Sequence, residues 1–301
     1  MSELGIGIIG LDTSHVTAFT KLLNDDGPYS VHGGKVVAAF PGGSADFELS
    51  RSRVEKFTKE LREQYGVQIV HSPRAVAEQV DAILLESVDG RVHLEQFKEV
   101  APFGKPVFID KPLAVCYSEA EEIARLAAQY NVPWMSSSAL RYAEGLTCIL
   151  KNKENGEIIG VDCFGPMQLE ATQPGLFWYG IHCAEVLFTV LGSGCTEVRV
   201  TSNNDHDVVT GLWEDGRIGA IRGNRKGNSQ FGALVHCEKA SCLADFRADE
   251  KPLYAGLLEQ VMLFFTGRKS PIDAAETLQI IQFIESANRS RDTGNTVHLV
   301  N

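Results

Sequence analysis

Short apolar segments alternate with helix-forming segments through the first 137 residues, and this alternation constrains the fold more than any other feature. The apolar segments have the length of buried strands, and the segments between them carry apolar residues at helical spacing. We expect strands over 4–10, 35–40, 67–70, 80–86, 107–109 and 132–137, with helices near 16–23, 51–65, 74–79, 91–103 and 118–130. This order of elements specifies an α/β fold with a doubly wound parallel sheet.

The second half of the chain changes character, because β-like runs follow one another with few helices between them. We expect strands over 160–170, 197–202, 207–213, 217–223, 232–236 and 241–246, and helices over 178–191, 257–266 and 273–288. Successive strands with segregated helices indicate an α+β domain on an antiparallel sheet. The chain is therefore predicted to form a doubly wound domain over residues 1–140 and an α+β domain over residues 141–301.

Charge and cysteine content exclude several classes of protein. The formal net charge of −11 argues against nucleic acid and anionic membranes as partners, because both attract clustered basic residues. The seven cysteines are dispersed and form no C-x-x-C pair, which is typical of reduced thiols in the cytoplasm. The apolar stretch over residues 4–11 is too short for a signal peptide or a membrane span. We expect a cytoplasmic protein.

The tripeptide Asp110-Lys111-Pro112 is the first candidate for chemistry. It follows the apolar run Val107-Phe108-Ile109, at the carboxyl end of a predicted parallel strand, where α/β sheets bind ligands. Pro112 disfavours helix at Lys111, so that the lysine stays extended at the strand tip. A lysine beside a carboxylate at such an edge is a candidate proton donor or oxyanion stabiliser. A solvated surface ion pair is the alternative.

The order of motifs resembles the GFO/IDH/MocA oxidoreductases over nearly the whole chain. The matching features are a glycine-ended first strand, the pattern Ser87-x5-His93, the Asp110-Lys111-Pro112 block in place of a Glu-Lys-Pro signature, Arg141-Tyr142, Gly180-Ile181-His182, and the closing segments 272–274 and 290–294. The resemblance implies a Rossmann-type domain, a second domain with a large open sheet, NAD or NADP as cofactor, and a sugar, cyclitol or related polyol as substrate. It also implies a homodimer or homotetramer assembled through the sheets of the second domains.

The dinucleotide fingerprint departs from the family pattern. It requires three glycines, for the tight turn, for close approach to the pyrophosphate and for helix packing. Only Gly10 remains, because Asp12 stands at the close-approach position and His15 at the packing position. We expect Asp12 to point away from the phosphates and cap the following helix, while Thr13, Ser14 and His15 offer hydrogen bonds to phosphate. A turn that only caps a helix is the alternative.

The end of the second strand leaves the choice between NAD and NADP open. An acidic residue there normally binds the ribose hydroxyls of NAD, but this chain continues Phe40-Pro41-Gly42-Gly43-Ser44. Ser44, with Arg51 or Arg53 beyond it, is a candidate for a 2′-phosphate. Solvent-facing arginines explain the same residues.

The resemblance places the catalytic histidine at His182, which would take the hydroxyl proton. Family members often carry an aspartate four residues earlier, whereas this chain has Trp178, which can stack on a sugar ring but cannot accept a proton. Glu185 lies one helical turn later and is expected to orient His182 or contact substrate. A histidine satisfied within an apolar core is the alternative.

The remaining candidates come from the same resemblance. Ser87 would contact the cofactor, and His93 would shape the nicotinamide side of the site, with the start of a solvated helix as the alternative for His93. Arg141 and Tyr142 would reach substrate oxygens. Imidazole is a good zinc ligand, yet the spacing of His15, His93 and His182 does not indicate a zinc site, and we predict no metal ligand.

Three functions remain after the sequence has been considered. The leading one is an NAD(P)-dependent oxidoreductase that transfers hydride between nicotinamide and a hydroxyl-bearing carbon, with Lys111, kept cationic by Asp110, steadying the alkoxide. The second is a redox-inactive family member that acts as a ligand sensor. The third is an isomerase or lyase that uses the same lysine and histidine.

Overall fold

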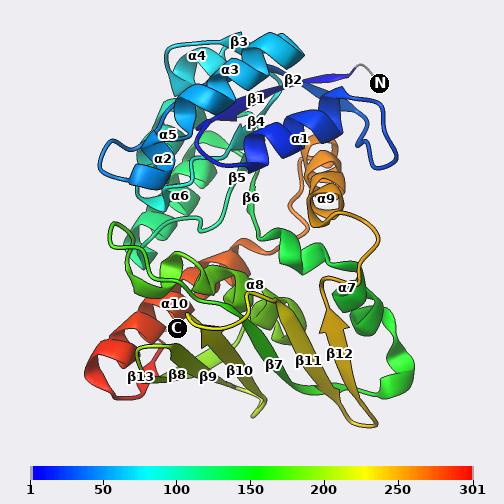
Figure 1. Ribbon diagram of the computed structural model, residues 1–301, viewed down its shortest axis with the longest axis vertical. Coiled ribbons are helices and arrows are strands. Elements are labelled where there is room, and N and C mark those ends of the chain that lie inside the picture. Colours follow the sequence, from blue (N-terminus) through cyan, green and yellow to red (C-terminus); the bar gives the residue numbers. More distant parts are fainter. Residues whose placement is uncertain (1–2, 300–301) are drawn as a thin grey trace. The chain divides into compact units, whose positions relative to one another are not determined.

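The computed structural model describes residues 3–299, which divide into two compact units (Figure 1). The first unit falls within residues 1–114, 118–137 and 254–274, and the second within 115–117, 138–253 and 275–301. The contacts within the chain thus group the segment 254–274 with the first unit, although it follows most of the second unit in sequence.

The first unit is built on a parallel sheet with the strand order β3-β2-β1-β4-β5-β6. Its strands are β1 (Leu4–Ile9), β2 (Gly34–Phe40), β3 (Gln68–Ile69), β4 (Ala82–Leu85), β5 (Val107–Ile109) and β6 (Trp134–Ser136). Every pairing between neighbours is parallel. The order reverses between β1 and β4, as in Rossmann folds, and ligands of such sheets bind outside the carboxyl ends of the strands at that point. The predicted doubly wound sheet is confirmed.

Helices of the first unit lie beside this sheet: α1 packs against β2 and α3, and α4 packs against β1, β2 and α5 (Figure 1). They are α1 (His15–Asn24), α2 (Glu48–Arg51), α3 (Val54–Tyr65), α4 (Pro73–Ala77), α5 (His93–Val100), α6 (Tyr117–Tyr130) and α9 (Leu253–Gly267). Gly66 ends α3 in the left-handed conformation, as expected of a helix that stops at glycine. Helix α6 begins at Tyr117, one residue before the expected start at 118.

The second unit is built on a sheet with the order β12-β11-β7-β10-β9-β8-β13. Its strands are β7 (Ile158–Pro166), β8 (Cys195–Ser202), β9 (His206–Trp213), β10 (Ile218–Asn224), β11 (Gly232–Cys237), β12 (Ser241–Asp245) and β13 (Val297–His298). Only the β7–β10 pairing is parallel among the described strands, so the predicted, mainly antiparallel sheet is confirmed. The short strand β13 was not predicted.

The α-helices described in the second unit are α7 (Glu144–Lys151), α8 (Gly180–Leu191) and α10 (Ala274–Thr293). Helix α8 is almost entirely buried and packs on β7 and β10, and Phe188 of α8 meets Phe283 of α10. Helix α7 was missed by the sequence reading. Its first N–H groups, at Glu144 and Gly145, are held by the carboxylate of Asp249, about a hundred residues away, so local sequence carries no signal for its start.

All seven cysteines are free thiols, and four of them are buried. Among residues 3–299, no helix combines the length and the apolar character that crossing a membrane requires.

Candidate active site

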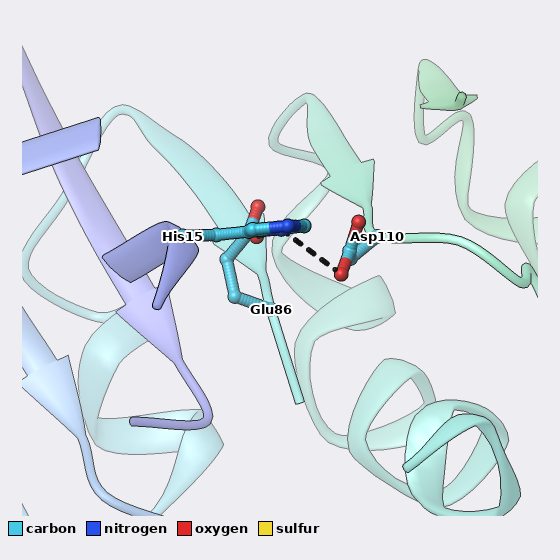
Figure 2. Close-up of side chains that lie close together, drawn as sticks. All are labelled: His15, Glu86 and Asp110. Carbon is cyan, nitrogen blue, oxygen red and sulfur yellow. Dashed lines mark ion pairs between the residues drawn. The ribbon is translucent and has the colours of Figure 1, made fainter. Parts of the chain in front are cut away.

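A buried cluster of charged side chains lies at the carboxyl edge of the parallel sheet (Figure 2). His15 begins α1, Glu86 follows β4 and Asp110 follows β5, so three neighbouring strand ends of one sheet bring them together. His15 Nδ1 lies 3.2 Å from Asp110 Oδ2 and 3.4 Å from Glu86 Oε2. Glu86 is fully buried and the side chain of Asp110 is 1% exposed. Sequence reasoning missed Glu86, because on its own it reads as the last residue of a strand.

Lys111 extends this cluster at the tip of β5. Its Nζ lies 3.7 Å from Asp110 Oδ2, and its side chain is 11% exposed. The predicted pairing of Asp110 with Lys111 is therefore present, but the carboxylate also faces His15. This excludes the solvated surface ion pair that the sequence had left open, since Asp110 has almost no contact with solvent.

The proximity of these charges shifts their titration. Burial alone would lower the pKa of His15, but Asp110 and Glu86 outweigh it and raise that pKa to about 9. Burial raises the pKa of Glu86 to about 7. Burial also opposes ionisation of Asp110, yet His15 and Lys111 outweigh it and hold the pKa of Asp110 well below its usual range. A protonated His15 beside an ionised Asp110 is thus the favoured state near neutral pH.

The turn between β1 and α1 keeps one feature of a dinucleotide site and replaces two. Gly10 has φ of +90°, and a Cβ there would lie 2.3–2.5 Å from atoms of Ser87, so only glycine fits. Asp12 is fully buried; its Oδ1 accepts the Val88 N–H at 3.0 Å and its Oδ2 accepts the Ser50 hydroxyl at 2.6 Å. The expected capping of α1 by Asp12 is therefore wrong, because Ser50 of α2 and Val88 of the loop after β4 engage the carboxylate instead.

Ser44, Ser87 and His93 form hydrogen bonds beside the carboxyl edge of the sheet. The Ser44 hydroxyl donates to Asp89 Oδ2 at 2.6 Å, and the Ser87 hydroxyl donates to Gln96 at 2.8 Å. His93 is fully buried, with Nε2 2.8 Å from the carbonyl of Ser87 and Nδ1 3.0 Å from the carbonyl of Pro112. Because it joins the loops after β4 and β5, His93 holds the backbone on which Lys111 stands.

Around the turn, Thr13 and Ser14 differ in exposure. Thr13 is buried and its hydroxyl lies 3.4 Å from the His15 N–H, whereas Ser14 is exposed at the start of α1 and caps no helical N–H through its side chain. The ring of His15 stacks on Phe19 and meets Tyr254 edge-on, at centroid distances of 5.4 and 4.9 Å. These ring contacts fix the imidazole plane.

Within the second unit, His182 lies in the first turn of α8 and its Nδ1 is 2.8 Å from the Ser138 hydroxyl. Its ring also meets the rings of Tyr179 and Phe231 edge-on. Trp178 lies just before the helix and packs against Tyr179, at a centroid distance of 5.9 Å. Ser138, rather than the Glu185 expected from the sequence, is therefore the residue that orients the ring of His182.

Glu185 instead belongs to a buried ion cluster with Arg141. Arg141 Nη2 lies 3.1 Å from Glu185 Oε2 and 2.7 Å from Glu276 Oε1, and its side chain is 10% exposed. Burial raises the pKa of Glu185, and Arg141 opposes that rise. The guanidinium is thus already bound to two carboxylates, while Tyr142 follows it in the same 3₁₀ turn, Ala139–Tyr142.

Comparison with known proteins agrees with this architecture. Residues 5–137 match the model of the GFO/IDH/MocA family, described as an oxidoreductase family with an NAD-binding Rossmann fold. The match covers most of the Rossmann-type unit and less than half of the whole chain. The family resemblance inferred from the motifs is confirmed, together with its class, the NAD-binding oxidoreductases. No curated protein matches the sequence significantly.

Solved structures extend the likeness in fold to the whole chain. A probable dehydrogenase from Thermotoga maritima has a TM-score of 0.81 at 17% identity, covering 98% of this chain and 99% of its own. Myo-inositol dehydrogenase from Lactobacillus casei, in complex with NAD(H) and myo-inositol, has a TM-score of 0.78 at 15% identity, covering 100% and 97%. GenD2 from gentamicin A biosynthesis, in complex with NAD, has a TM-score of 0.79 at 18% identity, covering 100% and 97%.

The turn between β1 and α1 is where the NAD of this family would place its diphosphate. In this fold the pyrophosphate of a dinucleotide is held by the glycine turn and the first N–H groups of α1. Gly10 keeps the turn, and the carboxylate of Asp12 is directed at Ser50 and Val88 rather than at the helix N-terminus. The carboxylate of Asp12 is therefore turned away from the position that a diphosphate would take at this turn.

Proposed function

We propose that this chain is an NAD(P)-dependent oxidoreductase that transfers a hydride between nicotinamide and a hydroxyl-bearing carbon of a sugar, cyclitol or related polyol. The observation that carries the proposal is the Lys111 ammonium at the carboxyl edge of the parallel sheet, 3.7 Å from the buried carboxylate of Asp110. The family match and the fold shared with a myo-inositol dehydrogenase support it. When bound, the nicotinamide supplies the hydride acceptor or donor.

The protein's own residues have separate tasks in this proposal. Gly10 and the first turn of α1 would hold the diphosphate through backbone N–H groups. Lys111 would stabilise the negative charge that develops on the substrate oxygen, because a fixed ammonium in a water-poor site costs no reorganisation during the reaction. His182 would accept the hydroxyl proton, and Ser138 would fix the orientation of its ring through Nδ1.

Titration of the purified protein with NADH and NADPH, followed by nucleotide fluorescence, tests the cofactor. We expect saturable binding of at least one nucleotide, and a panel of polyols with the matching oxidised cofactor should then include one that yields reduced cofactor. The panel includes myo-inositol, other cyclitols and sugars. Binding without turnover on any polyol would contradict the proposed reaction.

A redox-inactive ligand sensor is the second candidate, and the buried Asp12 at the close-approach position favours it. The absence of binding to either nucleotide in the same titration would support the sensor and contradict the oxidoreductase. A nucleotide that copurifies and never exchanges would instead favour an isomerase or lyase that uses Lys111 and His182.

We also infer a homodimer or homotetramer that forms through the sheet of the second unit. One face of that sheet is packed by α8, whereas Ile218 and Leu243, on the other face, are 58% and 63% exposed. Exposed apolar side chains on one sheet face are typical of an interface.

Light scattering should give the mass of two or four chains, and the double variant Ile218→Asp, Leu243→Asp should lower it to the mass of one chain. A monomeric wild type would contradict this inference.

A further inference from the structure

We propose that His15, Glu86 and Asp110 form a binding site for one divalent transition-metal cation, such as Zn²⁺ or Mn²⁺. One ligand atom from each residue can be chosen so that all three lie within 4.8 Å of one another (Figure 2). Imidazole nitrogen and carboxylate oxygen are the donors that Zn²⁺ accepts in three-ligand protein sites, and carboxylates also suit Mn²⁺. The proposal concerns cation binding and does not depend on hydride transfer.

The measured separations agree with ligands around one ion. Donor atoms bound at about 2.1 Å to a tetrahedral or octahedral cation lie roughly 3.0–3.4 Å from each other. His15 Nδ1 lies 3.2 Å from Asp110 Oδ2 and 3.4 Å from Glu86 Oε2, and both distances fall within the range expected for two ligands of one ion. Neither oxygen is placed to accept a hydrogen bond from the ring nitrogen, although both are close to it.

Burial provides the second, independent observation. Glu86 is fully buried and has His15 as its ion-pair partner, as does Asp110, while no described residue donates a well-aligned hydrogen bond to either carboxylate oxygen of Glu86 or to Asp110 Oδ2. Buried carboxylates normally receive hydrogen bonds or bind a cation, because an unsatisfied buried charge is costly. Two such groups directed at one imidazole form a set of donors that a cation would satisfy at once.

The surroundings agree with a closed site beside the proposed reaction centre. Phe19 and Tyr254 hold the His15 ring in place, so the nitrogen is pre-oriented towards the two carboxylates. Lys111 lies next to Asp110 on the side of the strand tip. A cation bound at Nδ1 would displace the proton of His15 to solvent. The neutral imidazole, two carboxylates, the divalent cation and the ammonium would then sum to a net charge of +1, which would attract a substrate oxygen.

Metal binding is tested on the untagged, full-length protein after treatment with EDTA and removal of the chelator. Equilibrium dialysis against Zn²⁺ or Mn²⁺, with the bound metal measured by mass spectrometry, should give one ion per chain. Glu86→Gln and Asp110→Asn should each weaken binding more than tenfold. Asp89→Asn is the matched control, since Asp89 is also a buried carboxylate of this unit but is engaged by Ser44 and Arg91, and it should bind like the wild type.

Several outcomes would overturn the proposal. One is that the wild type binds no stoichiometric metal, and another is that Glu86→Gln and Asp110→Asn bind it with the affinity of the wild type. A third such outcome is that Asp89→Asn loses as much affinity as those two variants. Far-UV circular dichroism checks the fold of each variant, with His15→Gln as a replacement if one of them does not fold. Addition of Co²⁺ to the wild type needs no variant: we expect a visible absorption band that Zn²⁺ abolishes, and its absence would count against the site.

Discussion

Lys111→Ala is expected to lower kcat for polyol oxidation by about 10³-fold, while the affinity for NADH or NADPH changes little. General acid–base and electrostatic groups each contribute effects of roughly 10²–10⁴-fold. Lys111 is the cation at the tip of β5, whereas the proposed diphosphate contacts are backbone N–H groups of the β1–α1 turn. Steady-state kinetics on the polyol found in the screen gives kcat, and fluorescence titration gives the nucleotide affinity.

The chain offers a matched control for this variant. Lys105 also precedes a proline and flanks β5, but it lies at the opposite end of the strand, where its ammonium donates to the carbonyls of Ala77 and Val80. Lys105→Ala should keep kcat within a few-fold of the wild type. If Lys111→Ala retained the wild-type kcat, Lys111 would have no role in the reaction.

Arg141→Ala is expected to lower the free energy of unfolding by about 3–5 kcal/mol, the usual loss when one partner of a buried ion pair is removed. The guanidinium lies 3.1 Å from Glu185 and 2.7 Å from Glu276, and its removal leaves the Glu185 carboxylate buried without its cation. Urea unfolding followed by circular dichroism measures the change. A large loss of stability would indicate that Arg141 stabilises the fold, whereas a small one would indicate that it is available to bind substrate.

Two further variants sharpen the measurement. Arg125→Ala removes an arginine whose ion pair with Glu122 is exposed on α6, and it should unfold close to the wild-type urea concentration because solvent screens exposed pairs. Combining Arg141→Met with Glu185→Gln removes both charges and should recover part of the stability lost in Arg141→Ala. If Arg141→Ala unfolded at the same urea concentration as the wild type, the ion cluster would contribute no stability.

The secondary structure of the first unit was predictable because its signals are local. Apolar runs of strand length, helical periodicity and a terminating glycine such as Gly66 depend on neighbouring residues only. Helix α7 was missed for the opposite reason, since Asp249 caps it from a distant part of the chain. The short strand β13 was missed because two residues carry no periodicity and its pairing with β8 is long-range.

Part of the candidate site was also predictable. Lys111 and Asp110 could be placed at a strand tip because the pattern of β5 defines where the strand ends, and parallel strands end at one edge. The motif of His182 located it on a helix. Its partner Ser138 and the engagement of Glu185 by Arg141 depend on packing between residues more than forty positions apart. The division of the chain at residue 140 and the localisation stay predictions.

The sequence by itself determined the α/β class and the lysine at the end of β5, because these follow from periodicity and from adjacent residues, and its motifs carried the resemblance to the GFO/IDH/MocA family. Only the tertiary structure decided what surrounds that lysine. Glu86, His15 and Asp110 are far apart along the chain, and they meet because β1, β4 and β5 are neighbours whose carboxyl ends share one edge of the sheet. Burial at that edge then converts three ordinary side chains into a coupled group of charges, and no local pattern encodes that burial.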